Sequence, residues 1–484
     1  MHISNFLKSG KSHLFIMLYF IFTVFLQFFI LNSSQFASGT DGYYYAYQIK
    51  SMHEKGVFSA PESSLTLYYL YFFSLAVKNI VLSNKIAVSF LKGFLVLEIY
   101  SAVSNLHDRK TGAAAAVLSS SCLMINFFTC EYVKSLGAMV LFVFFINSML
   151  LLDKNHGIKY YIFSACLFFS AALSHKVTAV FSLITVLAFF SVRIKKKHAA
   201  AAAVFLISAL AVFSVFVPNS LHYLDFQRFS GYFSLKPYLH LKSFFLIMHP
   251  GTVSKFEVLL LYFFPLIIFP YILLSHKKNI YLYSAMMAVF MICINPFSVF
   301  ESLDVAFRLF IFLFIPSVFI LSVALSKLKL KYILPFLILI IPLHVYNTKK
   351  SYLQFSHDYE LYSDIIPLLN LPENSLLIVH QGFDYLYWYE TGKKAFHYMP
   401  EAKHMNRPLY RLAFGVKRDL FEKYTDSNTG IRYLPGFYAL IEEKDWQSFL
   451  TKIPENERHR FNDWRNPGNF RENFLLRNQK FRKK

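Results

Sequence analysis

The first 346 residues alternate between long apolar runs and short polar turns. A helix needs about 20 apolar residues to cross the hydrocarbon core of a bilayer. Runs near this length cover 12–31, 65–82, 83–105, 112–130, 136–152, 158–174, 177–192, 198–218, 256–275, 279–295, 308–326 and 332–346. The pattern predicts an α-helical membrane protein that crosses the bilayer many times.

The first of these runs fits either a signal peptide or a membrane anchor. Residues 12–31 form an apolar stretch longer than the core of a signal peptide, and no A-x-A cleavage site follows it. We therefore expect an anchor that is retained.

Residues 347–484 differ in character from the part before them. Charged residues, Asn, Pro and Gly become frequent, and no apolar run is long enough to span a membrane. Within this part, 374–380 and 437–443 have the short apolar patterns of strands, and 444–453 has the pattern of a helix. The sequence predicts a membrane domain over 1–346 and a small α/β domain over 347–484.

The composition excludes an ordinary soluble or a disordered chain. Residues of the set AVILMFWYC make up 56% of the chain and charged residues 16%, against about 45–50% and about 25% in globular domains. The formal net charge of +21 fits basic cytoplasmic loops in contact with anionic membrane lipids, so no nucleic-acid partner is expected. The four cysteines lie within or beside apolar runs, which leaves no disulfide framework.

The distribution of Lys and Arg sets the expected orientation. Basic clusters lie at 109–110, 193–197, 277–278 and 327–331. If every run crossed the bilayer with the N-terminus inside, these clusters would lie outside, against the positive-inside rule. They fall inside if 65–82 lies along the outer interface, which its tyrosines favour. We expect about eleven transmembrane helices, an outer first loop over 32–82 and an extracytoplasmic C-terminal domain.

Polar side chains next to the predicted outer ends of the spans are the first candidates for chemistry. Asp41 opens the motif DGYYY (41–45) in the first outer loop, where it fits both a helix cap and a general base. Tyr44 belongs to a tyrosine surface suited to the membrane interface or to a sugar ring. Glu131 follows an apolar run, with Lys134 three residues on, which fits a local ion pair or a functional acid.

Three basic side chains lie near the same predicted face. His175 and Lys176 interrupt an apolar stretch, and Arg308 opens the run 308–326. His175 and Lys176 fit either contact with lipid headgroups or a functional role at membrane depth. Arg308 fits either a local pair with Asp304, four residues earlier, or binding of a lipid-linked phosphate, for which arginine is well suited.

Motifs of several other enzyme classes are absent from the sequence. No GxxxxGK[ST], HExxH or GxSxG segment occurs, which argues against a P-loop ATPase, an intramembrane zinc protease and a serine hydrolase. The sequence implies no certain cofactor, and it leaves a divalent cation open.

The order of the features resembles the GT-C superfamily of lipid-carrier-dependent glycosyltransferases. An Asp–aromatic motif at 41–45, an aromatic non-spanning segment at 65–82, an acid in the next outer turn and an outer C-terminal domain follow one another as in that superfamily. The chain lacks a D-x-D pair at the second turn and a WWDYG-like motif in the tail. It is therefore more similar to the bacterial branch that resembles protein O-mannosyltransferases and aminoarabinose transferases than to oligosaccharyltransferases.

The resemblance implies an inverting glycosyltransferase at the outer face of a bacterial inner membrane. Such an enzyme moves a sugar from a polyprenyl-phosphate donor to a hydroxyl of a glycan, lipid or protein acceptor. Asp41 would act as the base, and Glu131 would orient the acceptor or Lys134, or help to hold a divalent cation. The three basic side chains named above would offset the charge on the departing phosphate.

Two other functions stay open at this point. A transporter or flippase of lipid-linked saccharides would need polar side chains facing a path through the membrane, and the later runs over 256–346 offer few. A non-catalytic membrane scaffold with a sensory outer domain would leave Asp41 replaceable.

Overall fold

The computed structural model describes residues 11–60, 64–155, 157–193, 233–238, 257, 259–275, 279–294, 298–300, 309–355, 359–396, 407–414, 431–435, 438–452 and 454–455. The chain forms two compact units. The bundle unit comprises residues 1–35 and 51–355, and the sheet unit comprises residues 36–50 and 356–484.

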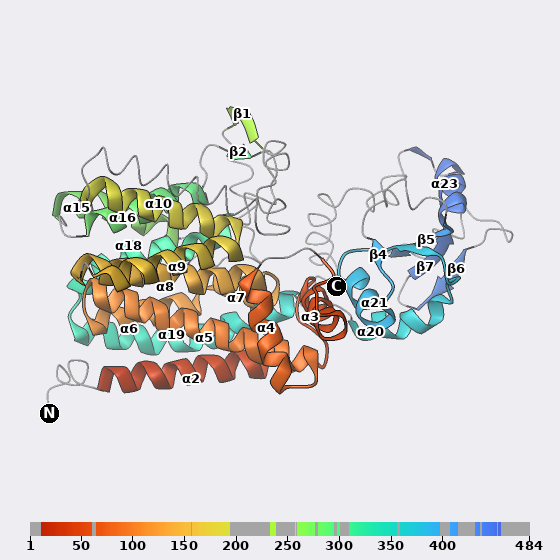
Figure 1. Cartoon of the computed structure of the whole chain (residues 1–484), viewed down its shortest axis with the longest axis horizontal. Helices are drawn as coiled ribbons and strands as arrows, with labels where there is room; N and C mark the ends of the chain where they lie inside the picture. The colour runs from red at the N-terminus through yellow and green to blue at the C-terminus, as the bar shows by residue number, and fades with distance from the viewer. Residues whose placement is uncertain are drawn as a thin grey trace. The chain divides into compact units, whose positions relative to one another are not determined.

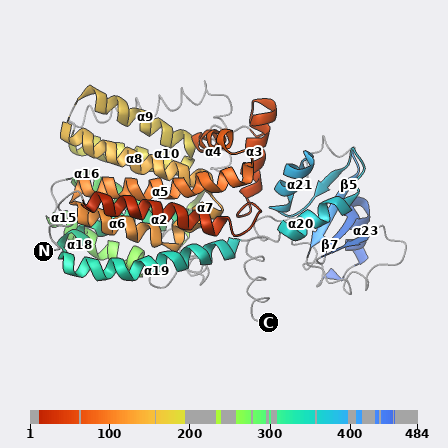
Figure 2. The same cartoon turned by 90° about the horizontal axis from the view of Figure 1, so that it is seen from below.

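The bundle unit consists mainly of apolar helices that lie side by side (Figures 1 and 2). Its helices are α2 (Lys11–Leu31), α4 (Leu65–Ala76), α5 (Ile80–Leu106), α6 (Arg109–Ser121), α7 (Leu123–Cys130), α8 (Val133–Asn155), α9 (Ile158–Ser174), α10 (Lys176–Arg193), η2 (Leu259–Phe263), α15 (Phe264–Ser275), α16 (Ile280–Ile294), η3 (Ile311–Leu313), α18 (Phe314–Lys327) and α19 (Leu330–Phe355). Strands β1 (Phe233–Tyr238) and β2 (Ser298–Phe300) form an antiparallel pair.

Most of the predicted apolar runs correspond to these helices. Among the residues that the structure describes, four helices are long and apolar enough to cross a membrane, namely α2, α5, α8 and α19, and the bent pair α6 and α7 would make a fifth. Six shorter apolar helices in the same part of the chain account for further runs. The chain is thus a multi-pass membrane protein by the length and composition of its helices, whereas the total of eleven spans stays a prediction. The run 198–218 lies outside the described residues.

The predicted run 112–130 is not one straight helix. Helices α6 and α7 meet at an angle of 59°, because Cys122 between them has an extended backbone. In an apolar environment the backbone groups released by such a break need partners. The Asn347 side chain donates to the Ser121 carbonyl at 2.6 Å, and the Leu123 amide donates to the Glu257 carboxylate.

The sequence before the break also weakens the helix. The hydroxyls of Ser119, Ser120 and Ser121 each donate to the backbone carbonyl three residues earlier, at 2.8–2.9 Å. Hydroxyl groups bonded in this way compete with the regular amide partners of those carbonyls. Hydropathy alone does not register this competition, so it predicts one continuous helix over 112–130.

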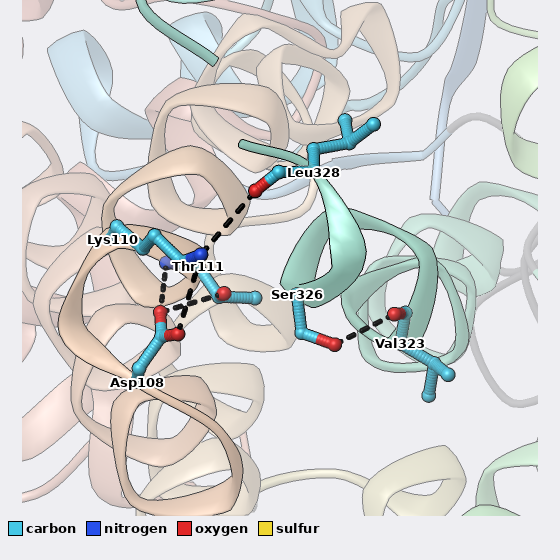
Figure 3. A network of polar contacts seen from close by, with 6 residues as sticks. All are labelled: Asp108, Lys110, Thr111, Val323, Ser326 and Leu328. Carbon is cyan, nitrogen blue, oxygen red and sulfur yellow. Dashed lines mark hydrogen bonds and ion pairs between the residues drawn. The ribbon is translucent and has the colours of Figure 1, made fainter. Parts of the chain in front are cut away.

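Two of the predicted inner turns lie side by side in the bundle unit, as Figure 3 shows. Asp108 caps α6 by accepting from the Thr111 amide at 2.9 Å and the Thr111 hydroxyl at 2.8 Å. The Lys110 ammonium donates to the Leu328 carbonyl at 3.3 Å, which joins the α5–α6 turn to the α18–α19 turn. Two basic clusters predicted on the same side of the membrane therefore lie together.

A fully buried lysine ties several helices together in the interior of the bundle unit. Lys92 in α5 is 0% exposed. Its ammonium donates to Gln27 Oε1 at 3.0 Å, Asn126 Oδ1 at 2.7 Å and Thr348 Oγ1 at 3.1 Å. An ammonium has three donors, so each finds an oxygen. Because these oxygens belong to α2, α7 and α19, one side chain connects three helices to α5.

Lys92 belongs to a longer set of buried polar side chains, which we call the polar file. It consists of Tyr19, Thr23 and Gln27 on α2, Lys92 on α5, and His344, Thr348 and Ser351 on α19. On α2 and on α19 the members recur every three or four residues, which places them on one helix face. The Tyr19 hydroxyl links the two helices through His344 Nδ1 at 2.9 Å and also bonds Ser120 Oγ at 2.6 Å.

The sheet unit has an α/β architecture, as predicted for the C-terminal part. Its five-stranded sheet has the order β4-β3-β5-β7-β6; β3 is parallel to β4 and to β5, while β7 is antiparallel to both of its neighbours. The strands are β3 (Leu376–Ile378), β4 (Ala395–Phe396), β5 (Leu409–Phe414), β6 (Arg432–Leu434) and β7 (Tyr438–Glu442). The helices are α20 (Tyr359–Ile365), η4 (Ile366–Leu369), α21 (Phe383–Thr391), α23 (Glu443–Lys452) and the first part of α3 (Gly42–Lys55). The predicted strands 374–380 and 437–443 and the predicted helix 444–453 are confirmed as β3, β7 and α23.

The division between the units differs from the one expected at 346–347. Helix α19 continues to Phe355, and residues 36–50 belong to the sheet unit. The continuation is polar in sequence, but Asn347, Thr348 and Ser351 are buried. A polar segment whose side chains face the interior of a bundle can remain helical, although its composition is typical of a loop.

The coordination of Lys92 predicts a loss of stability when its ammonium is removed. In Lys92→Met, the oxygens of Gln27, Asn126 and Thr348 stay buried without that donor, at a cost of roughly 1–3 kcal/mol. We expect the apparent Tm of the purified protein in detergent to fall by several degrees. Lys329→Met, at an exposed position, serves as the control and should leave Tm unchanged. An unaltered Tm for Lys92→Met would contradict the role of this side chain.

The length of α4 predicts that this segment does not cross the bilayer. Its 12 residues extend over about 18 Å at about 1.5 Å per residue, against a hydrocarbon core of about 30 Å. Single cysteines at the exposed positions Val57 and Lys78, in a cysteine-free background, should react with an impermeant maleimide from the same side. A cysteine at Arg109, beyond the long helix α5, should react from the other side. Labelling at 57 and 78 from opposite sides would overturn the prediction.

Candidate active site

Asp41 lies directly before α3, in the helix-cap position that the sequence suggested. The Tyr45 amide donates to the Asp41 carbonyl at 3.1 Å and opens the helix. The chain folds back tightly before this point, since a Cβ on Gly42 would lie 2.9 Å from the Ala37 Cβ. Gly39 has a positive φ of 72°, and its carbonyl accepts from the Tyr359 hydroxyl at 2.6 Å. Glycine at these positions thus permits the turn that presents Asp41.

The tyrosines after Asp41 pack against α21 of the sheet unit. The Tyr47 ring stacks on Trp388 with centroids 4.0 Å apart and planes 30° apart. The Tyr43 ring lies 5.3 Å from that of Tyr389, and the Lys50 ammonium donates to the Tyr389 carbonyl at 2.8 Å. We call this set of contacts the α3–α21 clamp. Part of the tyrosine surface therefore packs against the protein itself. From the sequence, this surface suited either the membrane interface or a sugar ring.

Tyr44, the tyrosine predicted to bind substrate, is only partly buried. Its ring lies 5.2 Å from that of Tyr385 in α21 and 5.5 Å from that of Tyr45. A contact with a sugar ring therefore stays a prediction for Tyr44, whereas Tyr43, Tyr45 and Tyr47 are buried side chains of the protein.

Burial controls the protonation of the groups around the clamp. It raises the pKa of the Tyr43 phenol, which a hydrogen bond with the backbone of Ala37 lowers only in part. It also raises the pKa of Tyr389, and the neighbouring Glu390 carboxylate adds to that effect. The pKa of Glu390 is itself raised by burial, partly offset by the Ser363 hydroxyl at 3.2 Å. The two tyrosines stay neutral at physiological pH.

The carboxyl end of β3 lies next to Asp41. The chain leaves β3 for β4 on one side and later returns to β5 on the other, and such a reversal marks the usual ligand crevice of an open α/β sheet. Gln381, three residues after β3, donates from Nε2 to Asp41 Oδ1 at 3.3 Å. Gln381 carries no signal in the sequence, because its contact with Asp41 joins residues 340 positions apart.

Glu131 is a buried acid at the carboxyl end of α7. It directly follows α7 and is 2% exposed. The Phe312 ring of η3 lies 4.9 Å from Phe128 in the last turn of α7 and 5.9 Å from the imidazole of His175. His175 joins α9 to α10. The end of α7, the α9–α10 turn and the start of η3 therefore meet around one aromatic ring.

The start of α4 lies at the same place, which we call the Glu131 end. The Ser64 hydroxyl donates to the Ser174 carbonyl, and the Thr66 hydroxyl donates to the Lys134 carbonyl, each at 3.2 Å. A Cβ on Gly137 would lie 2.3 Å from Thr66 Oγ1, so the close approach of α4 to α8 depends on this glycine.

The predicted site residues fall into three groups. The first group lies at the Glu131 end, where the contacts of Phe312 and Thr66 bring the segments of its members together. Its members are Glu131, Lys134, His175 and Lys176. Asp41 and Tyr44 lie in the sheet unit. Arg308 lies outside the described residues. Lys92 and Glu257 are buried charged residues that were not among the predicted site residues. Their positions within long apolar runs of the sequence could have identified them, because a charged side chain in such a run is costly and often functional.

No protein-family model matches the sequence, and no curated protein sequence matches it. The fold is similar to that of ArnT from Cupriavidus metallidurans, solved with bound undecaprenyl phosphate, at 12% identity and a TM-score of 0.52, over 88% of this chain and 97% of that chain.

It is also similar to an oligosaccharyltransferase of Archaeoglobus fulgidus in two structures. The apo form matches at 13% identity and a TM-score of 0.50, over 81% of this chain and 62% of that chain. The complex with Zn and sulfate matches at 12% identity and a TM-score of 0.52, over 87% and 72%. The chain thus spans less than two thirds of the length of the apo enzyme. These likenesses show a shared fold, and the resemblance expected from the sequence is confirmed at the level of the fold.

A metal site can be tested against the side chains present. Among the residues that the structure describes, no group of three or more His, Cys, Asp or Glu side chains lies close enough to hold a metal ion. Glu131 is one carboxylate at the Glu131 end, so the described residues alone do not form a complete metal site there.

The α3–α21 clamp predicts that one ring holds the start of α3 in place. Trp388→Ala removes the stacked partner of Tyr47, a contact worth about 0.5–1.5 kcal/mol beyond its buried area. We expect faster hydrogen exchange of the amides of residues 45–50. Thr391→Ala, which removes a hydroxyl bonded to the Tyr387 carbonyl within α21, should leave that exchange unchanged. Equal protection of these amides in both variants would refute the role of Trp388.

Proposed function

We propose that the protein is an inverting glycosyltransferase that moves a sugar from a polyprenyl-phosphate donor to an acceptor hydroxyl at the outer face of a bacterial inner membrane. The observation that carries this proposal is the fold. It is similar over 88% of the chain to an enzyme solved with undecaprenyl phosphate. In this chain one carboxylate, Asp41, lies between the first apolar helix and α3, and another, Glu131, directly follows α7.

The chemistry needs a base and a stabilised leaving group. Asp41 takes the proton from the acceptor hydroxyl while its oxygen attacks the anomeric carbon of the sugar. The bond from that carbon to the phosphate oxygen breaks in the same step, and the polyprenyl phosphate leaves with the electron pair. A single displacement inverts the anomeric configuration and needs no covalent intermediate on the protein.

Cations at the Glu131 end suit the phosphate side of this reaction. His175 and Lys176 stand where α9 meets α10, and Arg308 precedes η3 in sequence. Preorganised positive charge lowers the energy of a transition state in which negative charge grows. Glu131 orients the acceptor or Lys134, or helps to hold a divalent cation; a chelator titration separates these roles.

A transporter or flippase of lipid-linked saccharides is the second candidate, and the polar file favours it. A transport path needs polar side chains inside the membrane, and the structure provides them on α2, α5 and α19. However, all three donors of Lys92 are bonded to protein oxygens, which suits a structural role. A flippase would move lipid-linked saccharide across liposomes without forming a glycosidic bond, and Asp41→Asn would leave that flux intact.

The proposal predicts that Asp41→Asn abolishes most transfer. The purified protein in nanodiscs is incubated with a panel of radiolabelled polyprenyl-phosphate sugars and membrane-derived acceptors, and labelled product is counted. The amide keeps the size of the side chain but cannot take a proton, so transfer should fall by a factor on the order of 10² or more. Glu131→Gln should cost less if Glu131 only orients groups, and as much if it holds a metal, in which case EDTA also inhibits.

Two results would count against the proposal. Near-full transfer by a stable Asp41→Asn variant would remove the base assignment. A product with retained anomeric configuration would rule out the single displacement, because only two successive displacements at the same carbon restore the starting configuration.

A further inference from the structure

Gln381 emerges from a turn whose conformation is fixed from several sides. Gly382, the next residue, has a φ of 99°, a conformation that other residues rarely adopt. The buried Asp384 carboxylate accepts from the Gly382 amide and the Tyr385 amide, each at 2.8 Å. On the other side, the His380 ring bonds the Tyr438 hydroxyl at 2.8 Å. A side chain carried by such a turn starts from a defined position.

The contact of Gln381 with Asp41 suits the control of a base. The side-chain amide donates to Asp41 Oδ1 at 3.3 Å. A donor on a carboxylate favours its ionised form, which is the form that accepts a proton, and the contact also limits rotation of the carboxyl group. A hydrogen bond to an ionised acceptor is stronger than one between neutral groups.

The backbone that carries Asp41 is held by the same unit. The α3–α21 clamp fixes the first turns of α3, and the Tyr359 hydroxyl holds Gly39 on the other side of Asp41. Both the main chain and the side chain of Asp41 are thus positioned by residues of the C-terminal part of the sequence. A domain that served only to recognise the acceptor would not need these contacts.

We propose that Gln381 is a positioning residue of the reaction, which orients the Asp41 carboxylate for proton transfer. The C-terminal part of the chain then completes the catalytic centre through the carboxyl end of β3. This inference rests on the proposed function, since it assigns to Gln381 a role through Asp41.

The test compares steady-state constants of three variants with the wild type. Gln381→Leu removes the donor, and Gln381→Glu replaces it with an oxygen of nearly the same shape. Both should lower kcat by roughly 10-fold or more, the range for a lost hydrogen bond to a charged group, while KM for the lipid donor changes by less than about two-fold. Gln381→His places a ring N–H at a similar reach and should restore most of kcat.

Two controls separate positioning from general damage. Ser363→Ala removes another side-chain hydrogen bond of the same unit, to Glu390, and should leave kcat unchanged. In the Asp41→Asn background, Gln381→Leu should have no further effect on the residual rate, because both changes act through one carboxylate.

The outcomes distinguish this inference from the proposed function. An active wild type whose Gln381→Leu variant keeps its kcat within about two-fold would overturn the inference and leave the glycosyltransferase intact. Additive losses in the double variant would likewise overturn it, because Gln381 would then act independently of Asp41. A wild type that transfers no sugar from any donor of the panel would remove the proposed function and, with it, this role.

Discussion

The interior of the bundle unit depends on partners for the backbone groups that the break between α6 and α7 releases in an apolar surrounding. At this break the Asn347 side chain donates to the Ser121 carbonyl, and the Leu123 amide donates to the Glu257 carboxylate. Lys92 then bonds Asn126 within the short helix α7. These contacts fix the direction of α7, and Glu131 follows its last residue. The location of a candidate site residue thus follows from hydrogen bonding within an apolar surrounding.

Local hydropathy was sufficient to place most helices. The run 158–174 coincides with α9, and 83–105 differs from α5 by only a few residues at its start, because the transfer of apolar side chains into lipid depends mainly on the segment itself. The bend at Cys122 and the polar end of α19 could not be predicted in this way. Both depend on partners from distant segments, which a pattern along the chain does not contain.

The candidate site shows the same division between local and distant information. Asp41 and Glu131 were identifiable because each acid follows an apolar run, which is a local signal. Gln381 was not, since nothing in the sequence around it indicates a contact with residue 41. The tyrosines after Asp41 were ambiguous for a related reason, because an aromatic surface suits a sugar, a membrane interface or another helix. Their packing against α21 shows that another helix is the partner of Tyr43 and Tyr47.

The C-terminal unit is discontinuous in sequence, because residues 36–50 complete it. Residues 356–484 made alone would expose the rings that α3 covers, among them Trp388 and Tyr389, and such an apolar surface favours aggregation. The unit therefore does not behave as a module that can be excised, or exchanged with that of a relative, at one boundary. Any chimaera of this protein would need two junctions, one of them within α3, where residues 42–50 and 51–55 of a single helix belong to different units.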